Sequence, residues 1–201
     1  MGYRKRRRRD NDFSFIPKQK SFNGKKLMNG IAQWLVLGLV AVILGYSIVT
    51  FCVQTVTVVG PSMSDTLKDG QIVVVNKLIY KFEDIKRYDI VAFQRVGKNE
   101  YYEIKRVIGL PGEKIKISNG AIFINGEPLA DAPFNEDIIM SGVAGEEILI
   151  GDNEYFILGD NFNNSEDSRY TNVGNISKTE IIGKVVYIIK PENERGKIDN
   201  K

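Results

Sequence analysis

Residues 55–67, TVTVVGPSMSDTL, decide the organisation of this 201-residue chain, because they join a long apolar run to a series of short β-type segments. Val56, Val58 and Val59 predict a short strand over residues 55–59. Gly60 and Pro61 then end the strand, since proline has no N–H to donate to a sheet, and Ser62 is expected on a turn. A serine on a turn can act as a nucleophile, although a lone Gly-x-Ser pattern more often marks an ordinary turn.

The composition excludes several classes of catalytic site. With 43% hydrophobic and 26% charged residues, the chain suits one membrane segment and one globular domain of roughly 150 residues. It contains no histidine, which removes Ser-His-Asp and Cys-His triads and most catalytic zinc sites, so any general base is another side chain. Cys52 is the only cysteine, so neither an intramolecular disulfide nor a Cys-x-x-Cys pair can form. We expect no metal and no cofactor.

The charges are distributed unevenly along the chain. Residues 1–26 contain ten lysines or arginines, including the run RKRRRR at residues 4–9, and two aspartates, so residues 27–201 have a net charge of −5. Such a block could bind nucleic acid, but in front of an apolar run it is typical of the cytoplasmic side of a membrane protein, where it also meets anionic lipids. We predict a cytoplasmic tail over residues 1–30 and no nucleic-acid partner.

The apolar run predicts one transmembrane helix over residues 31–53. It contains no charged residue, and about 20 apolar residues suffice to cross the hydrocarbon core. Trp34 lies near one end, and Tyr46 and Phe51 lie toward the other, as is usual for aromatic residues at membrane interfaces. A cleaved signal peptide is the alternative, but its apolar core usually has only about 7–15 residues. We expect a single-pass protein of the plasma membrane, with a cytoplasmic N-terminus and residues 54–190 outside the cytoplasm.

Residues 54–190 have the pattern of a mainly antiparallel β domain, because short β-branched runs alternate with Gly, Pro, Asn and Asp. Asn119-Gly120 and Asn125-Gly126 flank an alternating Ala-Ile-Phe-Ile segment, and these dipeptides favour the type I′ turns that close hairpins. A loop is expected over residues 133–141, and a frayed polar tail over residues 191–201. The predicted strands are 55–59, 71–76, 90–94, 101–108, 114–118, 121–124, 147–150, 154–158 and 181–189.

Lys105 lies inside the predicted strand 101–108, on the same face as Glu103 and Val107. If that face is buried, the charged form of the lysine is disfavoured and its amine can take a proton from a serine hydroxyl. In a chain without histidine, Lys105 is the natural candidate for a general base. The alternative, common for a strand lysine, is a stem that covers apolar surface while the ammonium reaches water or Glu103.

Residues 159–169, GDNFNNSEDSR, are rich in loop formers and carry Asp160, Asp167 and Arg169. They could form a solvated turn, or a hydrogen-bonding scaffold in which carboxylates hold arginines and a serine hydroxyl orients the lysine amine. The Asp-x-Asn spacing invites a calcium-loop interpretation, but the glycine and terminal glutamate of such a loop are not at their positions.

Four segments, taken together and in this order, resemble the signature segments of bacterial type I signal peptidases of the single-anchor, Gram-positive-like kind. Each segment alone is common, but four of them in order behind one apolar run are highly specific, and the resemblance covers residues 31–189. The segments are Gly60-Pro61-Ser62-Met63, residues 88–93 (YDIVAF), residues 105–109 (KRVIG), and Gly159-Asp160-Asn161 with Ser165-x-Asp167-Ser168-Arg169.

The resemblance implies a membrane-bound serine endopeptidase with an antiparallel β domain that removes signal peptides from exported preproteins after small-x-small sequences. By this likeness Ser62 is the nucleophile and supplies an oxyanion N–H, and Lys105 is the general base. Gly60 stands where some members place a supporting hydroxyl. The other implied roles are a hydrogen bond to the lysine from Ser165, an ionic scaffold of Arg106, Asp160, Asp167 and Arg169, and substrate contacts by Met63 and Ile104. The implied partners are preprotein signal peptides and plasma-membrane lipids.

The chain departs from the family pattern at a few positions, none of which is Ser62 or Lys105. Asp65 stands at a usual proline, Tyr88 at a usual glycine and Phe162 at a usual arginine, and Gly174 comes later than expected. A self-cleaving repressor-type Ser/Lys protease is an alternative, but it is soluble and carries a DNA-binding module. A catalytically inactive, membrane-tethered β module that binds partners is another, and it would leave a buried Lys105 without a purpose. A sortase-like enzyme would need a histidine.

Overall fold

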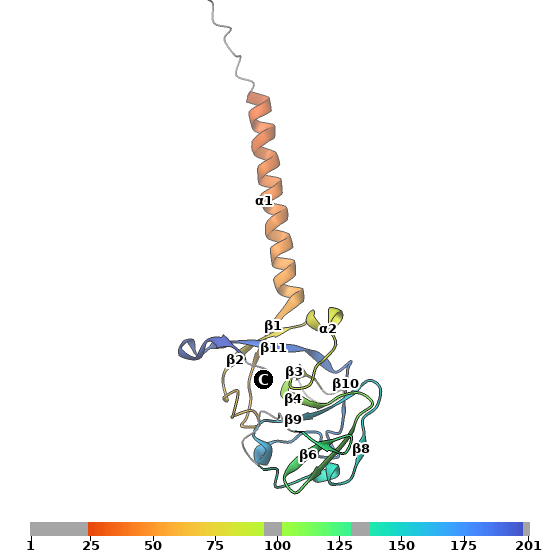
Figure 1. Cartoon of the computed structure of the whole chain (residues 1–201). Coiled ribbons are helices and arrows are strands. Elements are labelled where there is room, and N and C mark those ends of the chain that lie inside the picture. The colour runs from red at the N-terminus through yellow and green to blue at the C-terminus, as the bar shows by residue number, and fades with distance from the viewer. Residues whose placement is uncertain (1–23, 95–101, 130–136, 199–201) are drawn as a thin grey trace, which may run out of the picture. The chain divides into compact units, whose positions relative to one another are not determined.

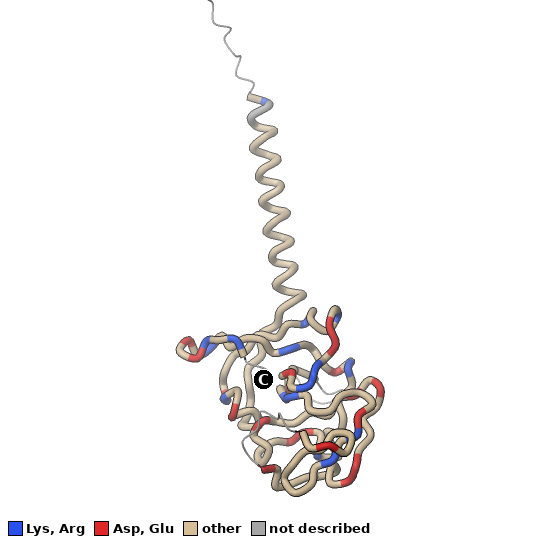
Figure 2. Tube along the Cα trace, viewed as in Figure 1, with Lys and Arg blue, Asp and Glu red and all other residues tan. Residues whose placement is uncertain are grey.

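The computed structural model describes residues 24–94, 102–129 and 137–198. The chain divides into two units, Met1–Leu44 and Gly45–Lys201. The described part of the first unit belongs to one helix, α1 (Gly24–Cys52), whose last residues lie in the second unit. Its segment Met28–Cys52 contains an 18-residue stretch with a mean hydropathy of 2.5 and is long and apolar enough to cross a membrane. Figure 2 shows almost no charged residue along α1.

The ends of α1 differ from the predicted ends of the apolar helix. The helix begins at Gly24, so residues 24–30 of the predicted tail are helical, and it ends at Cys52 because Val53 already begins a strand. The rest of the predicted basic tail, residues 1–23, lies outside the described residues.

The second unit is organised by a large antiparallel sheet with the strand order β1-β2-β11-β3-β4-β9-β10, in which β12 pairs with β11 (Figure 1). The fold class predicted from the sequence, a mainly antiparallel β domain after one apolar helix, is confirmed. The strands are β1 (Val53–Thr57), β2 (Ile72–Asn76), β3 (Ile90–Phe93), β4 (Glu103–Gly109), β9 (Glu154–Leu158), β10 (Ile176–Ser177), β11 (Ile181–Lys190) and β12 (Gly196–Lys197).

Strand β4 lies between β3 and β9 and is buried on both faces. Lys105 is opposite Val91 of β3, and Arg106 is opposite Leu158 of β9. All β4 residues after Glu103 are buried, because the strand contributes side chains to three separate hydrophobic clusters. The condition that the sequence left open for Lys105, burial of its strand, is therefore met.

A smaller antiparallel sheet has the order β7-β6-β5-β8. Asn119, Gly120, Asn125 and Gly126 all have positive φ angles, between 51° and 86°, and each pair forms the whole loop between two paired strands. This is the geometry of type I′ turns, as predicted. The strands are β5 (Lys114–Ser118), β6 (Ala121–Ile124), β7 (Glu127–Pro128) and β8 (Ile148–Leu149).

Strands of strong alternation were predicted with correct ends, namely 114–118, 121–124 and 154–158. Strand β1 begins and ends two residues before the predicted 55–59, because pairing with β2 runs from Val53 to Thr57. In the predicted loop 133–141, the described residues 137–141 are neither helix nor strand. The sequence pattern did not predict the short elements β7, β10, β12, α2 (Ile79–Phe82), η1 (Gly142–Gly145), η2 (Phe162–Asn164) and η3 (Glu192–Glu194).

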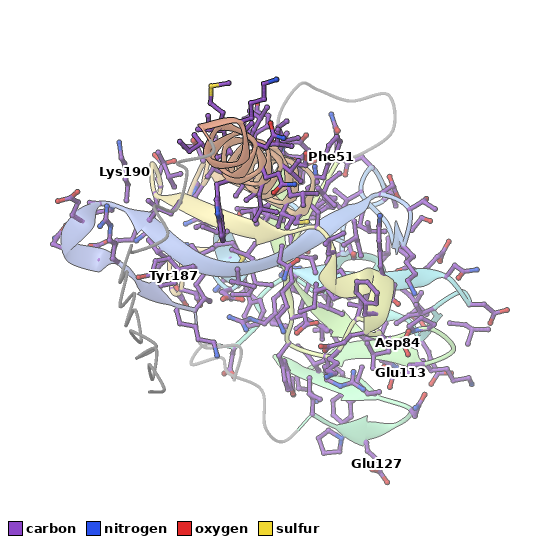
Figure 3. All side chains as sticks on the ribbon, turned by 90° about the horizontal axis from the view of Figure 1, so that it is seen from above. Phe51, Asp84, Glu113, Glu127, Tyr187 and Lys190 are labelled. Carbon is purple, nitrogen blue, oxygen red and sulfur yellow. The ribbon has the colours of Figure 1, made fainter. Side chains whose placement is uncertain are left out.

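The prediction of a frayed C-terminal tail is wrong for residues 192–198. Strand β12 pairs with β11 near Tyr187 (labelled with Lys190 in Figure 3), and Ile198 is buried in the cluster that also contains Val56 and Met63. Glu194 accepts hydrogen bonds from Lys68 Nζ (2.7 Å) and Gln71 Nε2 (2.6 Å), and these bonds lower the pKa of Glu194. One apolar side chain and these bonds therefore hold the tail against the segment that follows Ser62.

Candidate active site

Ser62 lies on a tight turn that follows the extended end of β1, as predicted. Gly60 has a φ of +82°, and its N–H donates to Asp69 Oδ1 (2.8 Å). The N–H of Leu67 then donates to the carbonyl of Met63 (2.6 Å), and the side chains of both residues are buried in the core. Because the buried side chains of Met63 and Leu67 hold the turn against the core, Ser62 lies partly exposed at the wall of a pocket.

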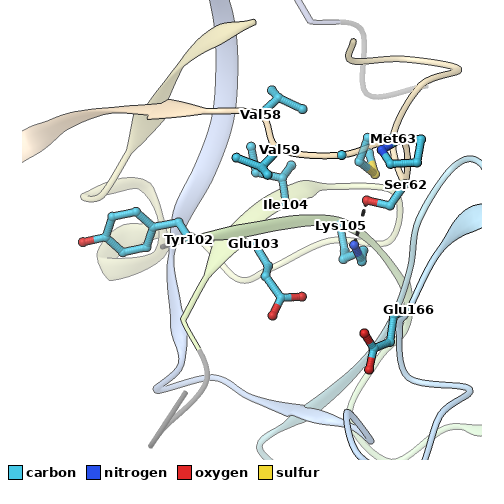
Figure 4. A pocket seen from close by; sticks show the side chains of 11 residues that line it. Val58, Val59, Ser62, Met63, Tyr102, Glu103, Ile104, Lys105 and Glu166 are labelled. Carbon is cyan, nitrogen blue, oxygen red and sulfur yellow. Dashed lines mark hydrogen bonds between the residues drawn. The ribbon is translucent and has the colours of Figure 1, made fainter. Parts of the chain in front are cut away.

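Lys105 meets Ser62 directly, although the two residues are 43 positions apart in sequence. Lys105 Nζ donates a hydrogen bond to Ser62 Oγ at 2.8 Å (Figure 4). Lys105 is only 5% exposed, since it lies within β4 between Ile104 and Arg106, which are buried as well. The amine therefore ends beside the serine hydroxyl, and the part of the alternative interpretation in which the ammonium reaches water is wrong.

Arg106 and Asp160 form a buried ion pair behind this contact. Arg106 Nε and Nη2 donate to the two carboxylate oxygens at 2.8 and 2.7 Å, a bidentate geometry. Arg106 Nη1 also donates to the carbonyl of Tyr88 (3.0 Å), and Thr66 Oγ1 donates to Asp160 Oδ2 (2.5 Å). The pair is 2–3% exposed, so these additional bonds compensate for the water that both charges lose. They connect β4, the end of β9 and the turn that carries Ser62.

Arg169 and Asp167 form a second buried, bidentate ion pair, with N–O distances of 2.8 and 2.9 Å. Asp167 also accepts from the N–H of Gly159 (3.2 Å), and Arg169 donates to the carbonyl of Phe162 (2.6 Å). These bonds close the loop 159–169 on itself. The four predicted scaffold residues thus form two ion pairs, one under the Ser62 turn and one inside the neighbouring loop.

Gly159 and Asn161 bring this loop against the backbone of the nucleophile turn. A Cβ on Gly159 would lie 2.5 Å from the carbonyl oxygen of Ser62 and still closer to Ser165 Oγ. The N–H of Asn161 donates to the same Ser62 carbonyl (3.1 Å), and its side-chain amide donates to the carbonyl of Pro61 (3.2 Å). Only glycine permits this approach, so its place in the motif has a steric reason.

The predicted hydrogen bond between Ser165 and Lys105 is not present. Ser165 is buried at 6% exposure, and its hydroxyl has no hydrogen-bond partner within the part of the chain that the structure describes. The hydroxyl lies instead against Gly159, where the absence of a side chain leaves room for it. A buried hydroxyl without a partner costs about 1–3 kcal/mol.

The positions that depart from the family pattern have local explanations. Tyr88 has a φ of 71°, a conformation that glycine adopts freely and that costs other residues about 1–3 kcal/mol. Its carbonyl is nevertheless held by Arg106. Phe162 is buried, and the guanidinium of Arg169 lies 6.0 Å from its ring centroid, within range of a cation–π contact. Asp65 is exposed and accepts a long bond (3.4 Å) from Ser64 Oγ.

Asp89, in the segment 88–93, has a structural position away from Ser62. Tyr80 OH donates to Asp89 Oδ2 (3.0 Å) and Lys184 Nζ donates to Oδ1 (2.5 Å), which joins α2 to β11. Burial raises the pKa of Tyr80, and the charge of Asp89 and its hydrogen bond raise it further. Tyr80 therefore stays protonated and donates to Asp89 throughout the neutral pH range.

The pocket in front of Ser62 and Lys105 has a volume of about 230 Å³. The predicted substrate-contact residues Met63 and Ile104 both line it. The sequence reasoning missed Thr66 and Asn161, which support the turn, and Glu166, which lines the pocket. Asn161 and Glu166 lie inside a motif segment and Thr66 follows one by three residues, but their spacing did not show which groups they contact. Among the described residues, no group of three or more His, Cys, Asp or Glu side chains could hold a metal ion.

Comparison with known proteins places the chain among bacterial signal peptidases. Residues 31–190 match the family described as signal peptidase, peptidase S26. A signal peptidase I from Bacillus licheniformis is 31% identical over 191 residues, which cover 92% of this chain and 100% of that protein. Signal peptidase IB from Staphylococcus aureus strain COL is 32% identical, with coverage of 82% and 92%. A crystal structure of a signal peptidase I from Enterococcus faecalis V583 is 29% identical, with a TM-score of 0.41 and coverage of 51% of this chain and 97% of that one.

We predict that Gly159→Ala destabilises the domain by about 1–3 kcal/mol, because the added methyl group overlaps the Ser62 carbonyl and the Ser165 hydroxyl. Gly145→Ala is the matched control, since a Cβ there would meet only Ser141 Cβ, at 3.6 Å. Thermal and urea unfolding of the purified variants measures the difference. Equal stability of the two variants would contradict the close packing of the loop against the turn.

Proposed function

The chain belongs to the signal peptidase family S26, and we propose that it cleaves N-terminal signal peptides from exported preproteins with Ser62 as nucleophile and Lys105 as general base. It is a peptidase of the signal-peptide-cleaving class, as membership in this family requires. The observation that carries the proposed chemistry is the 2.8 Å contact between Lys105 Nζ and Ser62 Oγ in a chain that has no histidine.

In the proposed reaction, the uncharged amine of Lys105 takes the proton of Ser62 as Oγ attacks the scissile carbonyl carbon. The resulting ammonium gives its proton to the leaving nitrogen, the C–N bond breaks, and the acyl group stays on Ser62. Water then attacks the ester, again with Lys105 as base, and releases the signal peptide with a free carboxylate. Burial of Lys105 supports this role, because it disfavours the ammonium form.

The backbone N–H of Ser62 is proposed to donate to the oxyanion that forms during the attack. Gly60 serves a different purpose, since its N–H is bonded to Asp69, and Pro61 has no N–H. Gly60 supports the site through its positive φ, which turns the chain toward Ser62. Thr66 and Asn161 act as positioning residues through their bonds to Asp160 and to the turn carbonyls.

The pocket supports cleavage after small side chains. Val58, Val59 and Ile104 line it together with Met63, and its volume of about 230 Å³ lies below the range of roughly 300–1,000 Å³ usual for ligand pockets. A side chain that precedes the scissile bond must fit in this space beside Ser62. We therefore propose small-x-small specificity, with Met63 and Ile104 as substrate contacts.

Removal of the nucleophile tests the proposed function. Ser62→Ala should lower cleavage of a detergent-solubilised preprotein by more than about 10³-fold, because no acyl-enzyme can form. Ser118→Ala, in the small sheet, is the control and should cleave like the wild type. Mass spectrometry of the products should place the cut after a small-x-small sequence. Turnover by a purified and folded Ser62→Ala enzyme would eliminate Ser62 as the nucleophile.

Substitution of Lys105 tests its role as base. We predict that the pKa of Lys105 lies below the ordinary lysine value of about 10.4, so cleavage should rise with pH through the lowered pKa. Lys105→Met should be inactive because a thioether accepts no proton, and Lys105→Arg should be inactive because a guanidinium stays protonated. Lys116→Arg, on the exposed face of β5, serves as control. Steady-state cleavage rates, measured from neutral to alkaline pH, test this prediction. An active Lys105→Arg enzyme would refute the mechanism.

We propose that α1 anchors the protein in the plasma membrane, with the basic N-terminal residues in the cytoplasm and the β domain outside. The apolar length of Met28–Cys52 and the ten basic residues before it support this orientation. Protease added to intact cells or protoplasts should digest the β domain without lysis. Protection of this domain until the membrane is broken would show the opposite orientation.

A further inference from the structure

The pocket has two chemically different sides. Figure 4 shows the apolar side chains of Val58, Val59 and Ile104 on one side of Lys105, and the carboxylates of Glu103 and Glu166 on the other. All five residues line the same pocket as Ser62. The apolar side suits the small side chains of a signal peptide, and the side with the two carboxylates has the opposite chemical character.

The direction of proton transfer determines which part of the substrate lies next to the acidic side of the pocket. Lys105 Nζ lies 2.8 Å from Ser62 Oγ, and in the proposed mechanism it returns its proton to the leaving nitrogen. The leaving nitrogen must therefore lie on the Nζ side of Oγ. The acyl part of the substrate then extends toward the apolar side, and the first residue of the released chain lies toward the carboxylates.

Glu166 is well placed to act on that residue. Its side chain is exposed, but its backbone lies between Ser165 and Asp167, which are 6% and 0% exposed and fix the loop. The side-chain amide of Asn172 donates a hydrogen bond to Glu166 Oε1, which restricts the orientation of the carboxylate. Glu103 reaches the same side of the pocket from the first residue of β4.

We infer that Glu166, together with Glu103, forms an acidic subsite that favours a basic side chain, and disfavours an acidic one, at the first residue after the scissile bond. The inference rests on the proposed function and adds to it a preference for the first residue of the released mature protein. Opposite charges a few ångströms apart at a wet surface attract and like charges repel, and each effect changes a rate by about fivefold. The preference is therefore a matter of rate among preproteins and does not decide whether cleavage occurs.

Two matched substrates test the subsite. They are signal-peptide substrates that differ only at the first residue after the cleavage site, which is lysine in one and glutamate in the other. The measured quantity is the ratio of the two kcat/KM values, which cancels any general loss of activity in a variant. The wild-type ratio should exceed one and should fall toward one as salt is raised, because mobile ions screen the exposed carboxylate.

Glu166→Gln should lower this ratio by about 25-fold, because loss of the charge lowers the rate for the lysine substrate about fivefold and raises the rate for the glutamate substrate by the same factor. Glutamine keeps an oxygen that can accept from Asn172, so the variant removes the charge and retains the bond. Glu166→Lys should bring the ratio below one. Glu127→Gln is the control, since Glu127 is exposed at the outer edge of the small sheet (Figure 3), and it should leave the ratio unchanged.

The possible results separate the subsite from the proposed function. An equal ratio in wild type and Glu166→Gln overturns the subsite while cleavage itself continues. A shifted pH profile with an unchanged ratio would show that Glu166 acts on Lys105 and not on the substrate, which also overturns it. If Glu166→Gln fails to fold, a wild-type ratio of one or less, or one that does not respond to salt, overturns the subsite. Failure of the wild type to cleave either substrate contradicts the proposed function instead.

Discussion

Burial of β4 on both faces is the constraint on which the active site depends. A strand between β3 and β9 has no solvent on either side, so two consecutive basic residues within it must find partners inside the protein. Arg106 does so through a bidentate bond to Asp160, and Lys105 places its amine against Ser62. The two residues use the interior differently. The arginine pairs with a carboxylate through two bonds, while the lysine contacts the hydroxyl of a serine.

The nucleophile turn is held from three directions by contacts that come from distant parts of the chain. Met63 and Leu67 anchor it in the core, and Thr66 reaches the Arg106–Asp160 pair. The loop after β9 presses Gly159 and Asn161 against the carbonyls of the turn. The C-terminal segment adds a further support, because Glu194 binds residues just beyond the turn. Ser62 is thus carried by rigid neighbours, which suits the precise placement that its proposed role as nucleophile requires.

Positions where the chain departs from the family pattern show that the fold tolerates local costs in free energy. Tyr88 keeps a left-handed backbone that suits glycine, and the bond from Arg106 to its carbonyl holds it there. Phe162, where the resemblance implies an arginine, packs an aromatic ring in the core and faces Arg169. Ser165 retains a buried hydroxyl without a partner among the described residues. The strained backbone of Tyr88 is bonded to Arg106, and Ser165 lies in the loop 159–169, so both costs arise beside the candidate site, as is common at functional sites.

The sequence by itself determined the apolar helix, the antiparallel β class and the two Asn-Gly turns, and it selected Ser62 and Lys105 as candidate site residues. Each of these depends on local chemistry: hydrophobic length, two-residue alternation, the φ angles that Asn-Gly permits, and the lack of histidine. Site roles and membrane orientation remain proposals. Only the tertiary structure decided what depends on contacts between distant residues. It separated the scaffold into two ion pairs, left Ser165 without a hydrogen bond to Lys105, and ordered the tail through Ile198. It also showed that Glu166 lines the pocket. The spacing of the motif could not indicate this, because it depends on packing between residues that are distant in sequence.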